Sequence, residues 1–118
     1  MAITYFNRKV GMKLELVAEG TLIADGTEQT LVEDTLLSNL SGFISLFNME
    51  IGDTVTIRQY VDMNGDGYRL YADETYNDAQ IQPAVYITSK TSNTRMRITL
   101  QQTAGTYRQF AYEFNREV

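Results

Sequence analysis

The chain of 118 residues contains no cysteine, no histidine and no tryptophan, and only one proline. Without cysteine there can be no disulfide bond, no thiolate nucleophile and no zinc–cysteine site. Without histidine the chain also lacks the commonest general base and the commonest transition-metal ligand. The adjacent carboxylates Asp73 and Glu74 make a poor acid/base pair, because neighbours on a strand point to opposite faces. We therefore predict that the protein is not an enzyme.

The sequence also lacks an excess of positive charge and any long apolar run. It carries 10 basic and 15 acidic side chains, a net charge of −5, which disfavours nucleic acid as a partner. No apolar segment approaches the roughly 20 residues that span a bilayer, so no membrane partner is expected. The first residues, MAITYFNRKVGMKLEL, have no apolar core typical of a secretory signal. We expect a protein that is made in the cytoplasm.

What the sequence does contain is a series of short segments in which apolar and polar residues alternate. The clearest are 54–62, 95–102 and 107–117, and turn signals separate such segments at intervals of roughly 8–15 residues. Hydrophobic residues make up 43% of the chain, enough for a core. The pattern predicts an all-β fold, an antiparallel, jelly-roll-like β-sandwich of about eight strands. We assign 13–118 to this single domain and 1–12 to an N-terminal arm or short strand.

The segment 34–51 fits two kinds of secondary structure. Its apolar residues fall at helical spacing, but the pair Ser41-Gly42 would be a poor helix interior. The neighbouring segments all alternate as strands do. We predict a strand over 43–47, preceded by at most one helical turn over 35–40.

A calcium-loop pattern overlaps the tight turn between 54–62 and 68–72. Its oxygen ligands would be Asp62, Asn64, Asp66, the Tyr68 carbonyl and Asp73, spaced as in a calcium-binding loop. The last position holds Asp where Glu is usual, and strands flank the loop in place of helices. Two interpretations stay open: a β-hairpin turn whose Asn, Asp and Gly residues supply its geometry, which we favour, or a site for calcium, the only cofactor candidate.

Five tyrosines gather between positions 60 and 86: Tyr60, Tyr68, Tyr71, Tyr76 and Tyr86. Their simplest role is cross-strand packing. Exposed tyrosines also suit a protein interface, for which Tyr60, Tyr71 and Tyr86 are the candidates. A third interpretation is a glycan-stacking platform formed by Tyr60, Tyr68, Tyr71 or Tyr86. Aromatic enrichment alone does not choose among the three.

Several stretches are similar in style to known viral proteins. They are GTLIADGTEQTLVE at 20–33, MEIGDTVTIR at 49–58, LQQTAGTY at 100–107 and the Phe110-x-Tyr112-Glu113 motif. Together they resemble small all-β structural proteins of tailed phages and archaeal viruses, which decorate capsids, form turrets or build tails. The resemblance implies a virion subunit, a homo-oligomer that also binds other virion proteins. The alternative function is a carbohydrate-binding β-sandwich module that uses the surface tyrosines.

Overall fold

A computed structural model describes residues 14–35, 39–88 and 95–117. Over these residues the chain forms eight strands: β1 (Leu14–Ile23), β2 (Gln29–Asp34), β3 (Leu40–Ser45), β4 (Thr54–Asp62), β5 (Tyr68–Asn77), β6 (Ala84–Thr88), β7 (Arg95–Ala104) and β8 (Gln109–Glu117). Within these ranges no helix is long and apolar enough to cross a membrane. The arm predicted for 1–12 lies outside the described residues.

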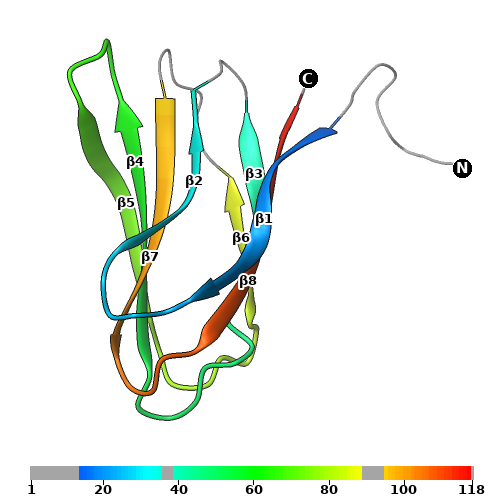
Figure 1. The fold of residues 1–118 in the computed structure, drawn as a ribbon, viewed down its shortest axis with the longest axis vertical. Helices are drawn as coiled ribbons and strands as arrows, with labels where there is room; N and C mark the ends of the chain where they lie inside the picture. Colours follow the sequence, from blue (N-terminus) through cyan, green and yellow to red (C-terminus); the bar gives the residue numbers. More distant parts are fainter. Residues whose placement is uncertain (1–13, 36–38, 89–94, 118) are drawn as a thin grey trace, which may run out of the picture.

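The strands form two four-stranded antiparallel sheets. Sheet A has the order β1-β8-β3-β6 and sheet B the order β2-β7-β4-β5, so consecutive strands mostly alternate between the sheets (Figure 1). Eight strands crossing between two sheets in this order make a jelly roll. The prediction of an antiparallel, jelly-roll-like sandwich of about eight strands is confirmed.

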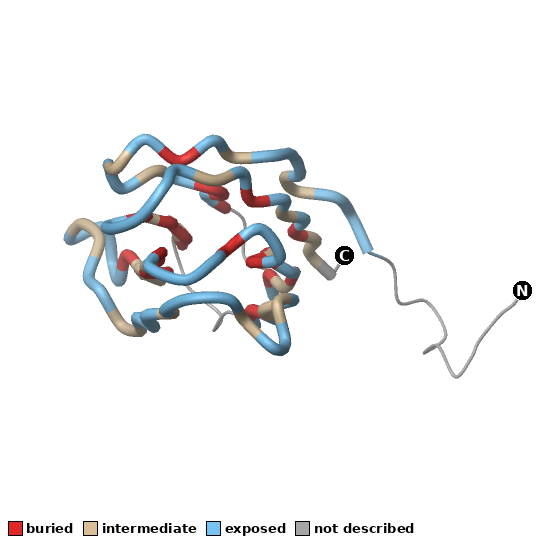
Figure 2. Tube along the Cα trace, turned by 90° about the horizontal axis from the view of Figure 1, so that it is seen from below, coloured by how far each residue is buried: buried red, intermediate tan, exposed pale blue. Residues whose placement is uncertain are grey.

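The core lies between the sheets because most strands present one apolar face. In β7, Met96, Ile98 and Leu100 are buried, as the alternating pattern predicted, while Phe110 and Phe114 of β8 enter from the opposite sheet with no exposed surface. Figure 2 shows the buried positions lying inside the layered trace and the exposed positions around it. Burying such side chains stabilises the fold by about 1.5–3 kcal/mol each.

Strand β3 begins and ends earlier than the sequence indicated. It spans Leu40–Ser45 in place of the predicted 43–47, and residues 36–38, part of the expected helical turn, lie outside the described residues. Gly42 allows β3 to lie very close to β8. A Cβ atom there would lie 2.1 Å from the Glu113 carbonyl oxygen of β8, so the two strands approach each other as closely as only glycine permits.

The hairpin of β4 and β5 is the predicted one, with a longer return strand. Asn64 and Gly65 adopt positive φ angles of 59° and 77° in its turn, the geometry for which such residues are favoured. Strand β5 continues past the predicted segment 68–72 to Asn77, and Tyr76 lies in this extension and packs against the core. A bulge opposite Gln59 and Tyr60 leaves Tyr71 of β5 without a partner in the pairing and changes which β5 residues face outward.

Candidate functional site

Asp62, the first residue of the predicted calcium loop, is held by protein groups. Its Oδ2 atom accepts a hydrogen bond of 2.8 Å from Arg95 Nε, and its Oδ1 atom accepts one of 3.1 Å from the Gly67 amide. The bond from Arg95, together with backbone donors, holds the pKa of Asp62 below its ordinary value despite burial. Asp62 thus closes the base of the hairpin turn.

The other predicted ligands do not converge on Asp62. Asn64 and Asp66 lie in the exposed turn, and the Tyr68 backbone pairs with Asp62, but Asp73 pairs with Arg58, four residues along β4 from Asp62. At the usual rise of a strand, that separation is about 13 Å. Within 14–35, 39–88 and 95–117, no three acidic side chains are grouped so as to hold a metal ion. Calcium binding stays an untested hypothesis, and the hairpin turn stays the interpretation that we favour.

The outer face of sheet B carries Tyr60 and Tyr68 in a polar network. The Tyr60 hydroxyl donates a hydrogen bond to Glu28, and the Tyr68 hydroxyl donates one to Glu33. The Arg97 guanidinium lies 4.9 Å from the Tyr60 ring centroid and 4.4 Å from that of Tyr68, a cation–π geometry. Burial, and then the bond to Glu33, raises the pKa of Tyr68 above its ordinary value. Both rings and both hydroxyls are therefore engaged within the molecule.

Glu28 links this network to the neighbouring strands. It accepts a hydrogen bond of 2.6 Å from the Thr99 hydroxyl and forms an ion pair of 3.6 Å with Arg58. Burial raises the pKa of Glu28, but the bonds from Thr99 and Tyr60 outweigh it, so the net shift is downward. Many of the polar groups on this face thus satisfy one another. The half-buried Tyr71 donates a hydrogen bond of 3.0 Å to Gln59, which alternates along β4 with the outward-facing Arg58 and Tyr60.

The outer face of sheet A has a different character. Phe43 is 50% exposed and Tyr86 57% exposed, and their ring centroids are 5.0 Å apart across the β3–β6 pair. Hydrogen bonds with the hydroxyls of Thr88 and Ser41 lower the pKa of Tyr86. The register places mainly small or uncharged side chains around this pair: Ser41, Ser45, Ala84, Thr88, Ala111 and Asn115. Glu113 of β8 pairs with Phe43 on one side and with Glu19 of β1 on the other.

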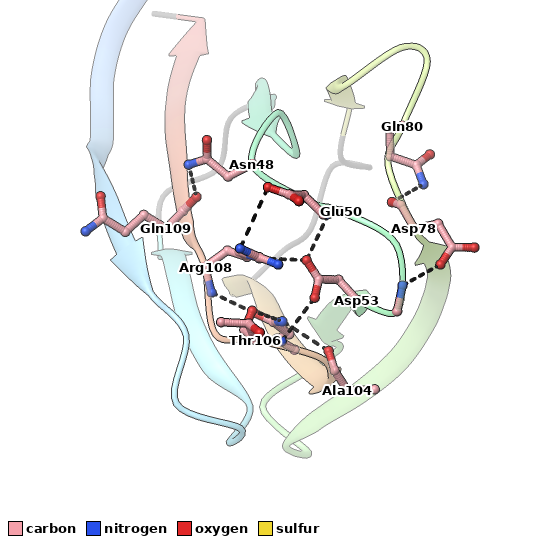
Figure 3. Close-up of polar contacts among 11 residues, drawn as sticks. Asn48, Glu50, Asp53, Asp78, Gln80, Ala104, Thr106, Arg108 and Gln109 are labelled. Atoms are coloured by element: carbon pink, nitrogen blue, oxygen red, sulfur yellow. Dashed lines mark hydrogen bonds and ion pairs between the residues drawn. The ribbon is translucent and has the colours of Figure 1, made fainter.

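The connections after β1, β3, β5 and β7 meet at one end of the sandwich, which we call the loop end (Figure 1). Asp53, only 1% exposed, joins the β3–β4 connection to the β7–β8 connection. Its carboxylate accepts hydrogen bonds from Arg108 Nε at 2.7 Å, the Glu50 amide at 2.9 Å and the Thr106 amide at 3.1 Å (Figure 3). Burial raises the pKa of Asp53, but these bonds, led by the one from Arg108, bring it below the ordinary value.

An open hollow of about 420 Å³ lies beside this carboxylate, lined by Phe47, Asn48, Glu50, Arg108 and Gln109. The Phe47 ring is 76% exposed, and Asn48 donates a hydrogen bond of 2.8 Å to the Gln109 carbonyl (Figure 3). Sequence reasoning missed this hollow. It expected residue 47 inside a strand, and the pairing of positions 53 and 108, which are 55 residues apart, leaves no local signal.

Comparison with known proteins bears on the fold. No model of a protein family matches the chain, and no curated protein matches it. A structure of the VP2 subviral particle of infectious bursal disease virus matches with a TM-score of 0.50 and 10% identity, over 92% of this chain and 32% of VP2. A D431N VP2 mutant in T=1 particles matches with a TM-score of 0.51 and 11% identity, over 92% of this chain and 31% of VP2.

The CBM22-1 xylan-binding domain of Paenibacillus barcinonensis Xyn10C also matches, with a TM-score of 0.40 and 12% identity, over 92% of this chain and 81% of that domain. This chain spans about a third of the length of the VP2 chains. At such low identities the likeness to VP2 shows a shared fold alone. The chain therefore has a β-sandwich fold that a viral capsid protein also uses.

Proposed function

We propose that this chain is a non-enzymatic structural subunit of a virus particle, a decoration, turret or tail component, that self-associates and binds other virion proteins. Its location would then be the virion, after synthesis in the host cytoplasm. The sequence resemblance to viral all-β proteins supports this, and so does the jelly roll shared with VP2, which is solved as subviral and T=1 particles.

The observation that carries the proposal is the contrast between the two outer faces. On the outer face of sheet B, many charged and aromatic side chains contact one another, such as Glu28, Tyr60 and Arg97. Sheet A instead leaves Phe43 and Tyr86 half-exposed, with Glu113 beside Phe43 on β8 and mainly small uncharged residues at the other neighbouring positions. Aromatic enrichment and depletion of charge are what distinguish the centre of a protein interface from the rest of a surface.

A second copy of this chain is the partner that fits the outer face of sheet A. One row across the sheet reads Glu19, Glu113, Phe43, Tyr86, with adjacent residues on neighbouring strands about 4.8 Å apart. A two-fold axis running between β3 and β6 would set Phe43 of each copy against Tyr86 of the other. The same axis would carry the acidic halves of the two faces to opposite sides, so that like charges do not meet.

Sedimentation velocity over a range of protein concentrations tests this proposal. The wild-type chain should shift from monomer to a larger species as concentration rises, and the double substitution Phe43→Ser/Tyr86→Ser should remain monomeric. The matched control is Leu70→Ser/Tyr107→Ser, which removes side chains of similar exposure, 51% and 57%, from other surfaces. A wild-type protein that stays monomeric at high concentration, or a control that dissociates equally, would overturn the proposal.

The alternative of a tyrosine platform for glycans has less support. Arg97 lies over the rings of Tyr60 and Tyr68, and their hydroxyls already donate to glutamates. A sugar would have to displace these contacts before it could stack. Tyr86 is exposed, but it stands against Phe43 on the face that we assign to self-association.

A further inference from the structure

The hollow at the loop end is an open depression that combines an exposed aromatic ring with polar side chains. Its side chains come from the β3–β4 connection, from the β7–β8 connection and from the start of β8. Sites for small ligands are concave, combine apolar walls with a few polar groups, and have volumes of about 300–1,000 Å³. A hollow of about 420 Å³ with one aromatic wall falls within this class.

The wall of the hollow is held in place before any ligand arrives. Leu46 and Met49 are buried on either side of Phe47, and they anchor the loop in the core. The Leu46 amide donates a hydrogen bond of 2.7 Å to the Pro83 carbonyl, and the Met49 amide donates one of 3.2 Å to the Leu46 carbonyl. An exposed phenylalanine on a fixed turn loses little conformational freedom when a ligand covers it, which favours binding.

Arg108 is fixed from several sides as well. Its Nε atom donates to the Asp53 carboxylate at 2.7 Å, and its backbone amide donates to Gln102 Oε1 at 3.0 Å. Its backbone carbonyl accepts a hydrogen bond of 3.0 Å from the Ala24 amide. The side chain keeps 24% of its surface exposed toward the hollow region, so its guanidinium is both positioned and accessible.

The polar groups indicate which chemistry the hollow would accept. Glu50 offers carboxylate acceptors, Arg108 offers N–H donors, and the amides of Asn48 and Gln109 offer both. A hydroxyl group both donates and accepts, so a ligand rich in hydroxyl groups can use all of these partners. The flat apolar face of a sugar ring would pack on Phe47.

The charge of the hollow then selects among sugars. The guanidinium of Arg108 is paired with the buried Asp53 at 2.7 Å and approached by Glu50 at 4.0 Å. One positive charge therefore faces two negative charges, a local sum of −1, in a chain whose net charge is −5. An anionic sugar would meet repulsion here, whereas a neutral one would not.

We propose that this hollow binds a neutral sugar residue of a glycan, stacked on Phe47 and hydrogen-bonded by Glu50 and Arg108. This site uses none of the tyrosines that the sequence suggested for glycan binding. It lies at the loop end, two residues past the end of β3, whereas the proposed self-association centres on Phe43 and Tyr86 within β3 and β6. As a virion subunit, the chain would use it to hold a surface glycan.

A glycan array that carries xylohexaose, cellohexaose, mannohexaose, lactose and sialyllactose tests this proposal, with calorimetry on each sugar that binds. The wild-type chain should bind at least one neutral sugar and should bind lactose no more weakly than sialyllactose. Phe47→Ala should weaken that binding by about tenfold or more, which corresponds to about 1.4 kcal/mol, and Phe47→Tyr should retain it. The matched control, Tyr107→Ala, removes another exposed aromatic ring from the loop end and should bind as the wild type does.

The thermal melt of Phe47→Ala should match that of the wild type, because the ring is mostly exposed. Absence of binding to every neutral sugar, preference for sialyllactose over lactose, or binding that Phe47→Ala leaves intact would each overturn the proposal. Sedimentation and calorimetry together distinguish a failure of this proposal from a failure of the proposed function. Phe47→Ala should self-associate as the wild type does, and Phe43→Ser/Tyr86→Ser should still bind the sugar.

Discussion

Replacement of Asp53 by asparagine should be among the most damaging single-atom changes in this protein. Both carboxylate oxygens accept hydrogen bonds: Oδ2 from Arg108 and the Glu50 amide, and Oδ1 from the Thr106 amide. An asparagine side chain has one oxygen, so its NH₂ group must face at least one of these donors. With the side chain only 1% exposed, little water is present to relieve that mismatch.

The size of the effect follows from the bonds that are lost. A hydrogen bond to a charged group contributes about 1.5–3 kcal/mol, and a buried donor left without an acceptor costs about 1–3 kcal/mol. We expect Asp53→Asn to lower the free energy of unfolding by about 3 kcal/mol, a large part of the stability of a small domain. For a chain of this size that corresponds to a fall in melting temperature of about 12 °C.

The matched control is Asp78→Asn at the same end of the molecule. Asp78 is exposed, and its Oδ1 atom accepts one hydrogen bond of 2.8 Å from the Gly52 amide, which an asparagine oxygen can accept equally. This substitution should change the free energy of unfolding by no more than about 0.5 kcal/mol. Urea denaturation and thermal melts of the three proteins give the comparison. If Asp53→Asn is no less stable than Asp78→Asn, the role assigned to the Asp53 carboxylate is refuted.

The same comparison should depend on pH. The pKa of Asp53 in the folded chain lies below its ordinary value of 3.8, so the folded state favours the ionised carboxylate. That contribution is fully present above pH 3.8 and is lost as the pH falls through the folded pKa. The stability difference between the wild type and Asp53→Asn should therefore be constant from pH 5 to 7 and should shrink below about pH 3.8.

Two further predictions concern the turns. Gly105 and Gly52 have φ angles of +93° and +91°, but a Cβ atom on Gly105 would lie 2.0 Å from Asp53 Oδ1, whereas one on Gly52 meets no atom within 4 Å. Gly52→Ala should therefore lower the free energy of unfolding by about 1–2 kcal/mol, the cost of backbone strain alone. Gly105→Ala should lower it by about 2 kcal/mol more, as measured by urea denaturation. Equal losses for the two variants would contradict the close contact between Gly105 and Asp53. Calcium should leave the melting temperature unchanged, because Arg95 already neutralises the first ligand of the predicted loop; a rise that Asp66→Ala abolishes would instead establish a calcium site.

The strands were predictable where one face is buried and the other is wet. Met96, Ile98 and Leu100 alternate with polar residues, and the structure buries all three in β7. Phe110 and Phe114 of β8 follow the same period. Strand boundaries were less predictable, because tertiary contacts such as the close approach of Gly42 to β8 leave no local signal in the sequence.

The polar contacts between distant segments were not predictable. Glu28 meets Tyr60 and Glu33 meets Tyr68 only because β2 and β4–β5 share sheet B, on either side of β7. The tyrosines were recognised from the sequence as candidate binding residues. Whether their rings are accessible to a ligand depends on those partners, which the sequence does not reveal. In the same way, the hollow beside Phe47 depends on a contact between the β3–β4 loop and β8.

The central claim is that the outer face of sheet A is a contact surface between copies. The chain has no cysteine, so one introduced thiol reports on a single position. Ala84→Cys places it beside Phe43 and Tyr86, and Thr75→Cys places it on the outer face of sheet B. We predict that maleimide labelling of Ala84→Cys slows as protein concentration rises, while labelling of Thr75→Cys does not. Equal labelling rates at every concentration, or slowing at Thr75→Cys alone, would contradict the account.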